Sequence, residues 1–199
     1  ITPKPIHAIT ILQDYYGAIT SAKLFIFSLV VGCCAVISYC FAAAGPQIAH
    51  DLLNLSPAEY GYWNLINIVG MLLGGVFAKK ILTKLSVIEL ITIGFLGYAV
   101  GIGSLAVMWC MASQSAFWFF FTTANLYLFS CFLFSGGSLI ASNALDDKAN
   151  AAAAMSFINM CFATLSVILL GYLVRDPLLG FIIILSAVWL LVVGLLIIR

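Results

Sequence analysis

Six long apolar runs dominate this sequence and decide what it can fold into. They cover about residues 24–45, 60–82, 87–109, 117–141, 150–174 and 178–198. A helix that crosses a bilayer needs roughly 20 predominantly apolar residues, and each run supplies that length. Charged residues make up only 8% of the chain, against about 25% in a soluble domain, so most of the surface must face lipid. The sequence therefore predicts an all-α integral membrane protein with six transmembrane helices.

The segment before the first run has a different pattern. Residues 6–20 are too short to span a membrane, but their apolar side chains fall on one helical face: Ile9, Leu12, Tyr16 and Ile19. This pattern predicts a helix lying on the inner membrane surface, with an ordered linker as the alternative. We therefore divide the chain into a cytoplasmic linker and interfacial helix, 1–23, and a six-helix transmembrane bundle, 24–199.

The basic residues predict the orientation of the bundle. If the first residues are cytoplasmic, the inside carries seven basic residues: Lys4, Lys23, Lys79, Lys80, Lys84, Lys148 and Arg199. The outside then carries only Arg175. Cytoplasmic loops are the ones enriched in lysine and arginine. Both ends are therefore expected in the cytoplasm, with the loop 46–59 outside, and a bacterial inner membrane is the expected location.

Residues that would indicate chemistry are sparse. Five of the six cysteines lie inside apolar runs, and no CxxC or Cys/His spacing occurs, which favours small apolar fillers over a metal or redox site. The two histidines, His7 and His50, lie outside the spans, and HExxH is absent. No basic run is long enough for nucleic acid. We therefore expect no enzymatic activity, no metal and no cofactor.

Polar side chains inside the apolar runs are confined to four of the six. Stripes of polar and aromatic residues mark the first, second, fourth and fifth runs, with candidate cavity residues Tyr39, Asn64, Asn67, Asn125, Met155 and Asn159. Burying an unpaired amide costs roughly 2–7 kcal/mol, so each must face another helix or water. For each amide two roles are possible: a hydrogen bond between helices, or a place in a shared substrate cavity. The third and sixth runs lack such stripes and are expected to face lipid.

The end of the second run combines small and basic residues. Gly70, Gly74 and Ala78 form a ridge of the kind that lets helix backbones approach closely. The following loop motif comprises Gly74, Gly75, Lys79, Lys80 and Lys84. We expect the ridge to serve packing and the lysines to lie on the cytoplasmic side.

These patterns carry a family resemblance over nearly the whole chain. The approach LQDYYGAITSAKLF, the run SYCFAAAGPQIAHDLLNLSPAEYGYWNLINIVGMLLGG with Pro46, and the loop GGVFAKKILTKLS resemble the C-terminal six-helix half of a major facilitator superfamily transporter. The nearest likeness is to Bcr/CflA-type drug:proton antiporters. The loop departs from the superfamily motif, because lysine stands where that motif has aspartate. SNALDDKANAAAAMSFIN resembles the entry into the family's eleventh helix, where Asn159 takes the place of a glutamine.

The resemblance implies a fold, an activity and partners. The fold would be one half of a transporter, built from two inverted three-helix repeats. The activity would be proton-coupled efflux of drugs or other small molecules by alternating access, which can confer drug resistance. An N-terminal six-helix half, normally on the same polypeptide, would complete the site, and the bilayer, the substrate and protons would be the other partners. An importer or exporter of one metabolite or siderophore, and a non-transporting assembly protein, remain alternatives.

The charge bias generates a test of topology. In a background without native cysteines, a cysteine at Ser56 is expected to react with an impermeant thiol reagent added to whole cells. A cysteine at Ser86 is expected to stay unlabelled until the membrane is permeabilised, because Ser86 lies beside the basic loop. Labelling of Ser86→Cys but not of Ser56→Cys in intact cells would show that the predicted orientation is wrong.

Overall fold

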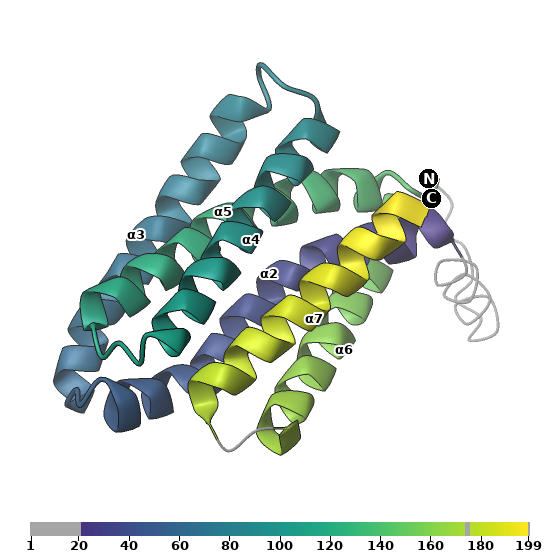
Figure 1. Cartoon of the computed structure of the whole chain (residues 1–199). Helices are drawn as coiled ribbons and strands as arrows, with labels where there is room; N and C mark the ends of the chain where they lie inside the picture. Colours follow the sequence, from purple (N-terminus) through teal and green to yellow (C-terminus); the bar gives the residue numbers. More distant parts are fainter. Residues whose placement is uncertain (1–20, 174–175, 199) are drawn as a thin grey trace.

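A computed structural model describes residues 21–173 and 176–198, and this part of the chain is helical with short turns (Figure 1). Its elements are α2 (Ala22–Gln47), η1 (Ile48–Leu52), α3 (Pro57–Ile81), α4 (Val87–Cys110), α5 (Ala116–Ser142), α6 (Lys148–Leu173) and α7 (Pro177–Ile198). Six helices are long and apolar enough to cross a membrane, and the bounds of α2 to α7 agree with the six predicted runs to within about three residues at each end. The predicted interfacial helix, 6–20, lies outside the described residues.

Side chains that bind the free backbone N–H groups set where several helices begin. Ser56 and Ser86 each form a reciprocal capping box with the glutamate three residues later. In the second box, the Glu89 Oε2 atom accepts hydrogen bonds from the Ser86 N–H at 2.7 Å and the Ser86 hydroxyl at 2.8 Å. Asp147 accepts from the backbone N–H groups of Ala149 and Asn150 at 3.0 and 3.2 Å. Asp147 therefore caps α6, as the helix dipole favours.

Pro46 lies inside the last turn of α2, where it removes one backbone hydrogen bond. The chain continues directly into the π-helical turn η1 and then turns at Asn54, which has a positive φ of 54°. Asparagine tolerates this left-handed conformation better than most residues. The π-helical turn η1 and the turn at Asn54 thus end the first span, and the capping box of α3 follows.

The bundle consists of two groups of three helices, as Figure 1 shows. In one group α5 packs between α3 and α4, and in the other α2 packs between α6 and α7. The groups meet through extensive packing of α2 on α5 and a smaller contact of α4 with α7. The two central helices thus carry the core: fifteen residues of α2 are buried, against four of α3.

The extensive contacts keep the same pairing when the first three helices are exchanged for the last three, although the α2–α7 contact is smaller than the α4–α5 contact. Exchanging α2, α3 and α4 for α5, α6 and α7 turns the α3–α5 contact into the α6–α2 contact, and the α4–α5 contact into the α7–α2 contact. The α2–α5 and α4–α7 contacts map onto themselves. Two smaller contacts, of α6 with α5 and with α7, have no equally extensive counterpart. Consecutive spans run in opposite directions, so the two sets of three helices have inverted topology.

The α3–α5 contact depends on the small-residue ridge predicted from the sequence. The buried residues of α3 are Asn67, Gly70, Gly74 and Ala78, which form a single line along the helix. A methyl group added at Gly74 would lie 2.4 Å from the Leu128 carbonyl oxygen of α5. The two backbones can therefore approach this closely only because the side chain is absent.

The third and sixth spans are expected to be the peripheral ones, but in the structure the second span is the most exposed. The second span, α3, buries the least of its surface within this chain, because α5 is its one extensive neighbour. Large apolar side chains such as Leu65 and Leu72 are exposed on it. Helices α4 and α7 also expose apolar side chains, including Leu96 and Leu190, so all four flanking helices present apolar surface to lipid or to a partner.

The helix ends sort into two membrane faces. The start of α2, the turns 82–86 and 143–147, and the end of α7 lie at one end of the bundle, towards the upper right in Figure 1. That end carries the five lysines of the described residues: Lys23, Lys79, Lys80, Lys84 and Lys148. We refer to it as the basic end, and to the opposite end as the outer end, as labels for the two ends of the bundle only.

Two adjacent glycines allow a matched test of the α3–α5 contact. Gly74→Ala is expected to lower the free energy of unfolding by about 1–3 kcal/mol, because the new methyl group forces the helices apart. Gly75→Ala makes the same chemical change where no atom lies within 4 Å, and it is expected to be neutral or stabilising by up to about 1 kcal/mol. Thermal unfolding in detergent measures both. Equal effects of the two substitutions would contradict backbone contact at Gly74.

Candidate functional site

The two amides of α3 form a hydrogen-bonded chain with α5. The Asn67 side chain is 3% exposed; its amide group donates to the Asn64 side-chain oxygen at 2.9 Å, and its own oxygen accepts from the Thr123 hydroxyl at 2.8 Å. Asn64 remains half-buried at the edge of this contact. Asn67 thus has a hydrogen-bonding role between helices, while Asn64 retains an accessible surface.

Asn125 lies on the side of α5 that packs against α4. Its amide group donates to the Gly97 carbonyl oxygen of α4 at 3.2 Å. The neighbouring Thr122 hydroxyl lies 2.9 Å from the Ser104 hydroxyl of α4, which also accepts from the Trp118 indole N–H at 2.9 Å. The polar stripe of the fourth span therefore joins α5 to α4, and this placement separates Asn125 from the other candidate residues.

The candidate residues of α6 lie along its contact with α2. A methyl group added at Gly32 of α2 would lie 3.6 and 3.7 Å from the Cα and Cβ atoms of Asn159, and 2.8 Å from the Phe162 ring. Ala151 and Ala154, from the four-alanine run, are fully buried in the core. Asn159 and Met155 are half-buried. The alanines let α6 approach α2 closely, and Asn159 lies along this contact, opposite Gly32.

Tyr39 lies in a groove between α2 and α6. Its side chain is 47% exposed, and with Met160 and Thr164 of α6 it lines a pocket of about 310 Å³. Val167 belongs both to this pocket and to a second one of about 320 Å³, which continues past Gln47 to the outer end. We call the two pockets together the α2–α6 groove. Among the described residues that line it, only Asp176, at its outer end, carries an ionisable carboxylate.

The residues of the predicted loop motif have separate roles. Gly74 is buried against α5, whereas Gly75 is exposed. Lys79 and Lys80 are exposed in the last turn of α3, where positive charge complements the helix dipole. Lys84 is exposed in the turn 82–86. The described structure gives these lysines no contact with an acidic side chain within salt-bridge distance.

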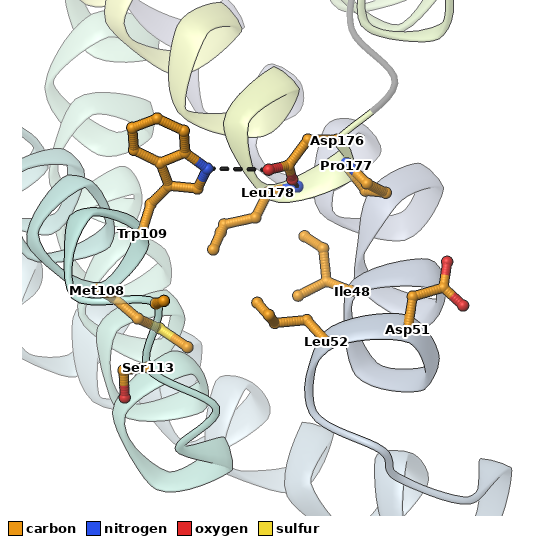
Figure 2. Close-up of a pocket in the computed structure, with 10 residues that line it drawn as sticks. Ile48, Asp51, Leu52, Met108, Trp109, Ser113, Asp176, Pro177 and Leu178 are labelled. Atoms are coloured by element: carbon orange, nitrogen blue, oxygen red, sulfur yellow. Dashed lines mark hydrogen bonds between the residues drawn. The ribbon is translucent and has the colours of Figure 1, made fainter.

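A pocket at the outer end was not anticipated from the sequence (Figure 2). It measures about 290 Å³ and lies between η1, the end of α4 and the start of α7. The Asp176 carboxylate accepts hydrogen bonds from the Leu178 and Leu179 N–H groups at 3.0 and 3.2 Å, and from the Trp109 indole at 2.9 Å. Asp176 therefore caps α7 and ties it to α4. An aspartate directly before a proline is a helix-start signal, but its tryptophan partner is 67 residues away.

Figure 2 also shows that the second carboxylate at this pocket points away from the Trp109–Asp176 pair. Asp51 is paired instead with the adjacent His50, at 2.7 Å. The remaining lining is mostly apolar, with Ile48 and Leu52 between the two acids and Met108 on the α4 side. This arrangement closes the outer end of α4 and α7 and does not bring the two acids together as a paired site.

The candidate residues thus fall into three groups. Asn64 and Asn67 lie at the α3–α5 contact, Asn125 lies at the α4–α5 contact, and the α2–α6 contact holds the rest: Tyr39, Met155 and Asn159. Substrate contact by any of them remains a prediction. Of the third group, Tyr39 lines the α2–α6 groove, whose other polar and polarisable lining comes from Gln47, Met160 and Thr164. This mixed lining suits binding of an amphipathic molecule.

No family model and no curated protein matches this chain. The assignment of function therefore rests on the sequence patterns and on the geometry described above.

Proposed function

We propose that this chain is one half of an alternating-access transporter of the major facilitator type, and that the intact protein exports small amphipathic compounds in exchange for protons. The observation that carries the proposal is the internal pseudo-symmetry of the packing, in which α2, α3 and α4 make contacts equivalent to those of α5, α6 and α7. Inverted repeats of membrane helices are a common architecture of secondary transporters, in which the substrate site lies near the midplane at the repeat interface. The two inverted sets of three helices agree with this architecture.

The α2–α6 groove supports the location of a substrate path. Tyr39 lies eight residues before the end of α2 at Gln47, which places it about 12 Å along the helix from that end. The hydrocarbon core is about 30 Å thick, so Tyr39 lies near mid-membrane depth. A groove that runs from this depth to the outer end is a route along which a small molecule can move.

The proposed exchange with protons requires a carrier acid, and the positions of the acidic residues bear on where that acid lies. The acidic residues of the described structure lie in the turns or first helical turns: Asp51, Glu59, Glu89, Asp146, Asp147 and Asp176. A carboxylate that carries a proton across a membrane lies inside the bundle, facing a cavity. We therefore place the proton-carrying acid in an N-terminal six-helix half, expected on the same polypeptide. The same half would cover polar surface that is costly to leave in lipid.

A transporter of one specific metabolite or siderophore is the second candidate. It is favoured by the small volume of the Tyr39 pocket, about 310 Å³, which is at the lower end of ligand pockets in general. An assembly protein that does not transport is a lesser candidate.

Alanine substitutions at two asparagines distinguish a role in substrate binding from a role in helix packing. Asn159→Ala retains the Cα and Cβ atoms that face Gly32, so stability is expected to be unchanged, while loss of one hydrogen bond to substrate lowers flux about two- to tenfold. Asn67→Ala makes the same chemical change at the α3–α5 contact and is expected to lower the free energy of unfolding by about 1 kcal/mol. Thermal unfolding and dye or drug flux in proteoliposomes under a proton gradient measure the two effects.

The control for this experiment is the 199-residue chain reconstituted alone beside the intact protein. The half alone is expected to give no saturable flux. Robust saturable flux from the half without self-pairing would overturn the half-transporter reading. Normal flux in Asn159→Ala would show that the Asn159 amide does not contact the substrate. Absence of any proton-dependent flux of drugs, dyes or metabolites by the intact protein would favour the assembly protein.

A further inference from the structure

An apolar groove opens on the side of the bundle where α4 and α7 lie side by side (Figure 1). It has a volume of about 550 Å³. Helix α4 contributes residues from Ile88 to Leu96, α7 contributes residues from Trp189 to Ile197, and Phe27 of α2 also lines it. We call it the α4–α7 groove. It is separate from the α2–α6 groove and lies on helices without polar stripes.

The polar atoms of the α4–α7 groove are already engaged. The Thr92 hydroxyl donates to the Ile88 carbonyl oxygen at 2.9 Å, and the Trp189 indole N–H donates to the Phe95 carbonyl oxygen at 2.9 Å. Each of these side chains has one hydrogen to donate. The walls therefore offer no free donor and no ionisable group, and only an apolar occupant matches them.

The depth of the groove matches one leaflet. Ile88 to Leu96 spans eight residues of α4, and Trp189 to Ile197 spans eight residues of α7, so each wall is about 12 Å long. One leaflet accounts for half of a hydrocarbon core about 30 Å thick. A transmembrane helix of a partner or of a second copy crosses both leaflets and needs a longer groove. An acyl chain fits within this one.

The groove opens at the basic end. Its walls are the first turns of α4 and the last turns of α7, and both helices have these turns at that end. Two exposed lysines lie near the opening: Lys84 precedes the α4 cap Ser86 by two residues, and Lys23 precedes Phe27 by one helical turn. Glu89 also lies there, and its Oε2 atom accepts from the Ser86 N–H and hydroxyl groups. With this carboxylate counted against the two lysines, the opening keeps a net positive charge. Positive charge beside an apolar channel favours a lipid with a negative head group.

From these observations we propose that the α4–α7 groove holds an acyl chain of an anionic phospholipid from the leaflet at the basic end, with its head group beside Lys23 and Lys84. A lysine near a membrane surface strengthens binding of an anionic lipid about fivefold. The two together therefore select an anionic over a zwitterionic lipid by up to about 25-fold. The inference does not depend on what the protein transports.

A tryptophan in the groove wall provides the probe. The chain has four tryptophans; Trp63, Trp109 and Trp118 lie near the outer ends of their helices, and only Trp189 lies in the α4–α7 groove. In the intact protein, every tryptophan except Trp189 is replaced by phenylalanine. The variant is reconstituted into phosphatidylcholine vesicles with increasing fractions of brominated phosphatidylglycerol or brominated phosphatidylcholine. Quenching of Trp189 fluorescence gives the relative association constant of the two lipids.

The expected ratio favours phosphatidylglycerol at least fivefold and falls towards 1 in Lys23→Gln/Lys84→Gln. Lys79→Gln/Lys80→Gln removes the same charge from the same membrane face, on α3, and is expected to leave the ratio unchanged. Ile88→Phe/Leu96→Phe fills the groove and is expected to reduce quenching by both lipids. Leu65→Phe/Leu72→Phe on α3 is its control, because the exposed fractions match: 55% and 62%, against 56% and 61%.

Three results would overturn the proposal. A ratio near 1 before any lysine is replaced means that the groove takes bulk lipid without selection. An equal fall in both lysine pairs means that general surface charge, and not the pair beside the groove, attracts the lipid. Absence of quenching by either brominated lipid means that a protein segment covers Trp189. Each variant is first shown to be monodisperse and to unfold at a temperature near that of the parent.

Discussion

Close backbone contact around α5 is the interaction on which the rest of this structure depends. Lipid tails are as apolar as leucine side chains, so helices in a membrane associate through tight packing and not through burial from water. Gly70 and Gly74 of α3 bring that helix to within contact of the α5 carbonyl groups. On the other side, Gly97 of α4 receives the Phe129 ring of α5, which would lie 2.1 Å from an added methyl group. These contacts hold α5 between two helices.

The same arrangement recurs around α2, which lies between α6 and α7. Here the small residues are Gly32 on α2 and the alanines at the start of α6. The four-alanine run therefore has a physical reason: a helix that begins in a charged turn capped by Asp147 must then approach α2 closely. Two central helices with matching flanking pairs produce a bundle with internal pseudo-symmetry. The flanking helices each keep one side free for lipid, a partner or a ligand.

Much of the fold could be predicted from the sequence. The six spans follow from their length and apolarity, and the start of α6 follows from the acids and alanines of the stretch 142–159. Pairing between distant residues could not be predicted, because hydropathy does not encode which helix a polar side chain meets. Thr122 and Asn125 share a stripe that suits a cavity equally well, yet the structure pairs them with Ser104 and Gly97 of α4. The Trp109–Asp176 bond likewise depends on how two helix ends meet.

We propose that Tyr39 faces a water-filled path near the middle of the membrane, as expected for a transporter. In a background without native cysteines, the intact protein carries Tyr39→Cys or, as a lipid-facing control, Leu190→Cys on α7. The account predicts that an impermeant thiol reagent modifies Tyr39→Cys, that a bound substrate slows this reaction, and that Leu190→Cys does not react. If Tyr39→Cys is as unreactive as Leu190→Cys from both sides of the membrane, the groove is filled by lipid or protein and the account is contradicted.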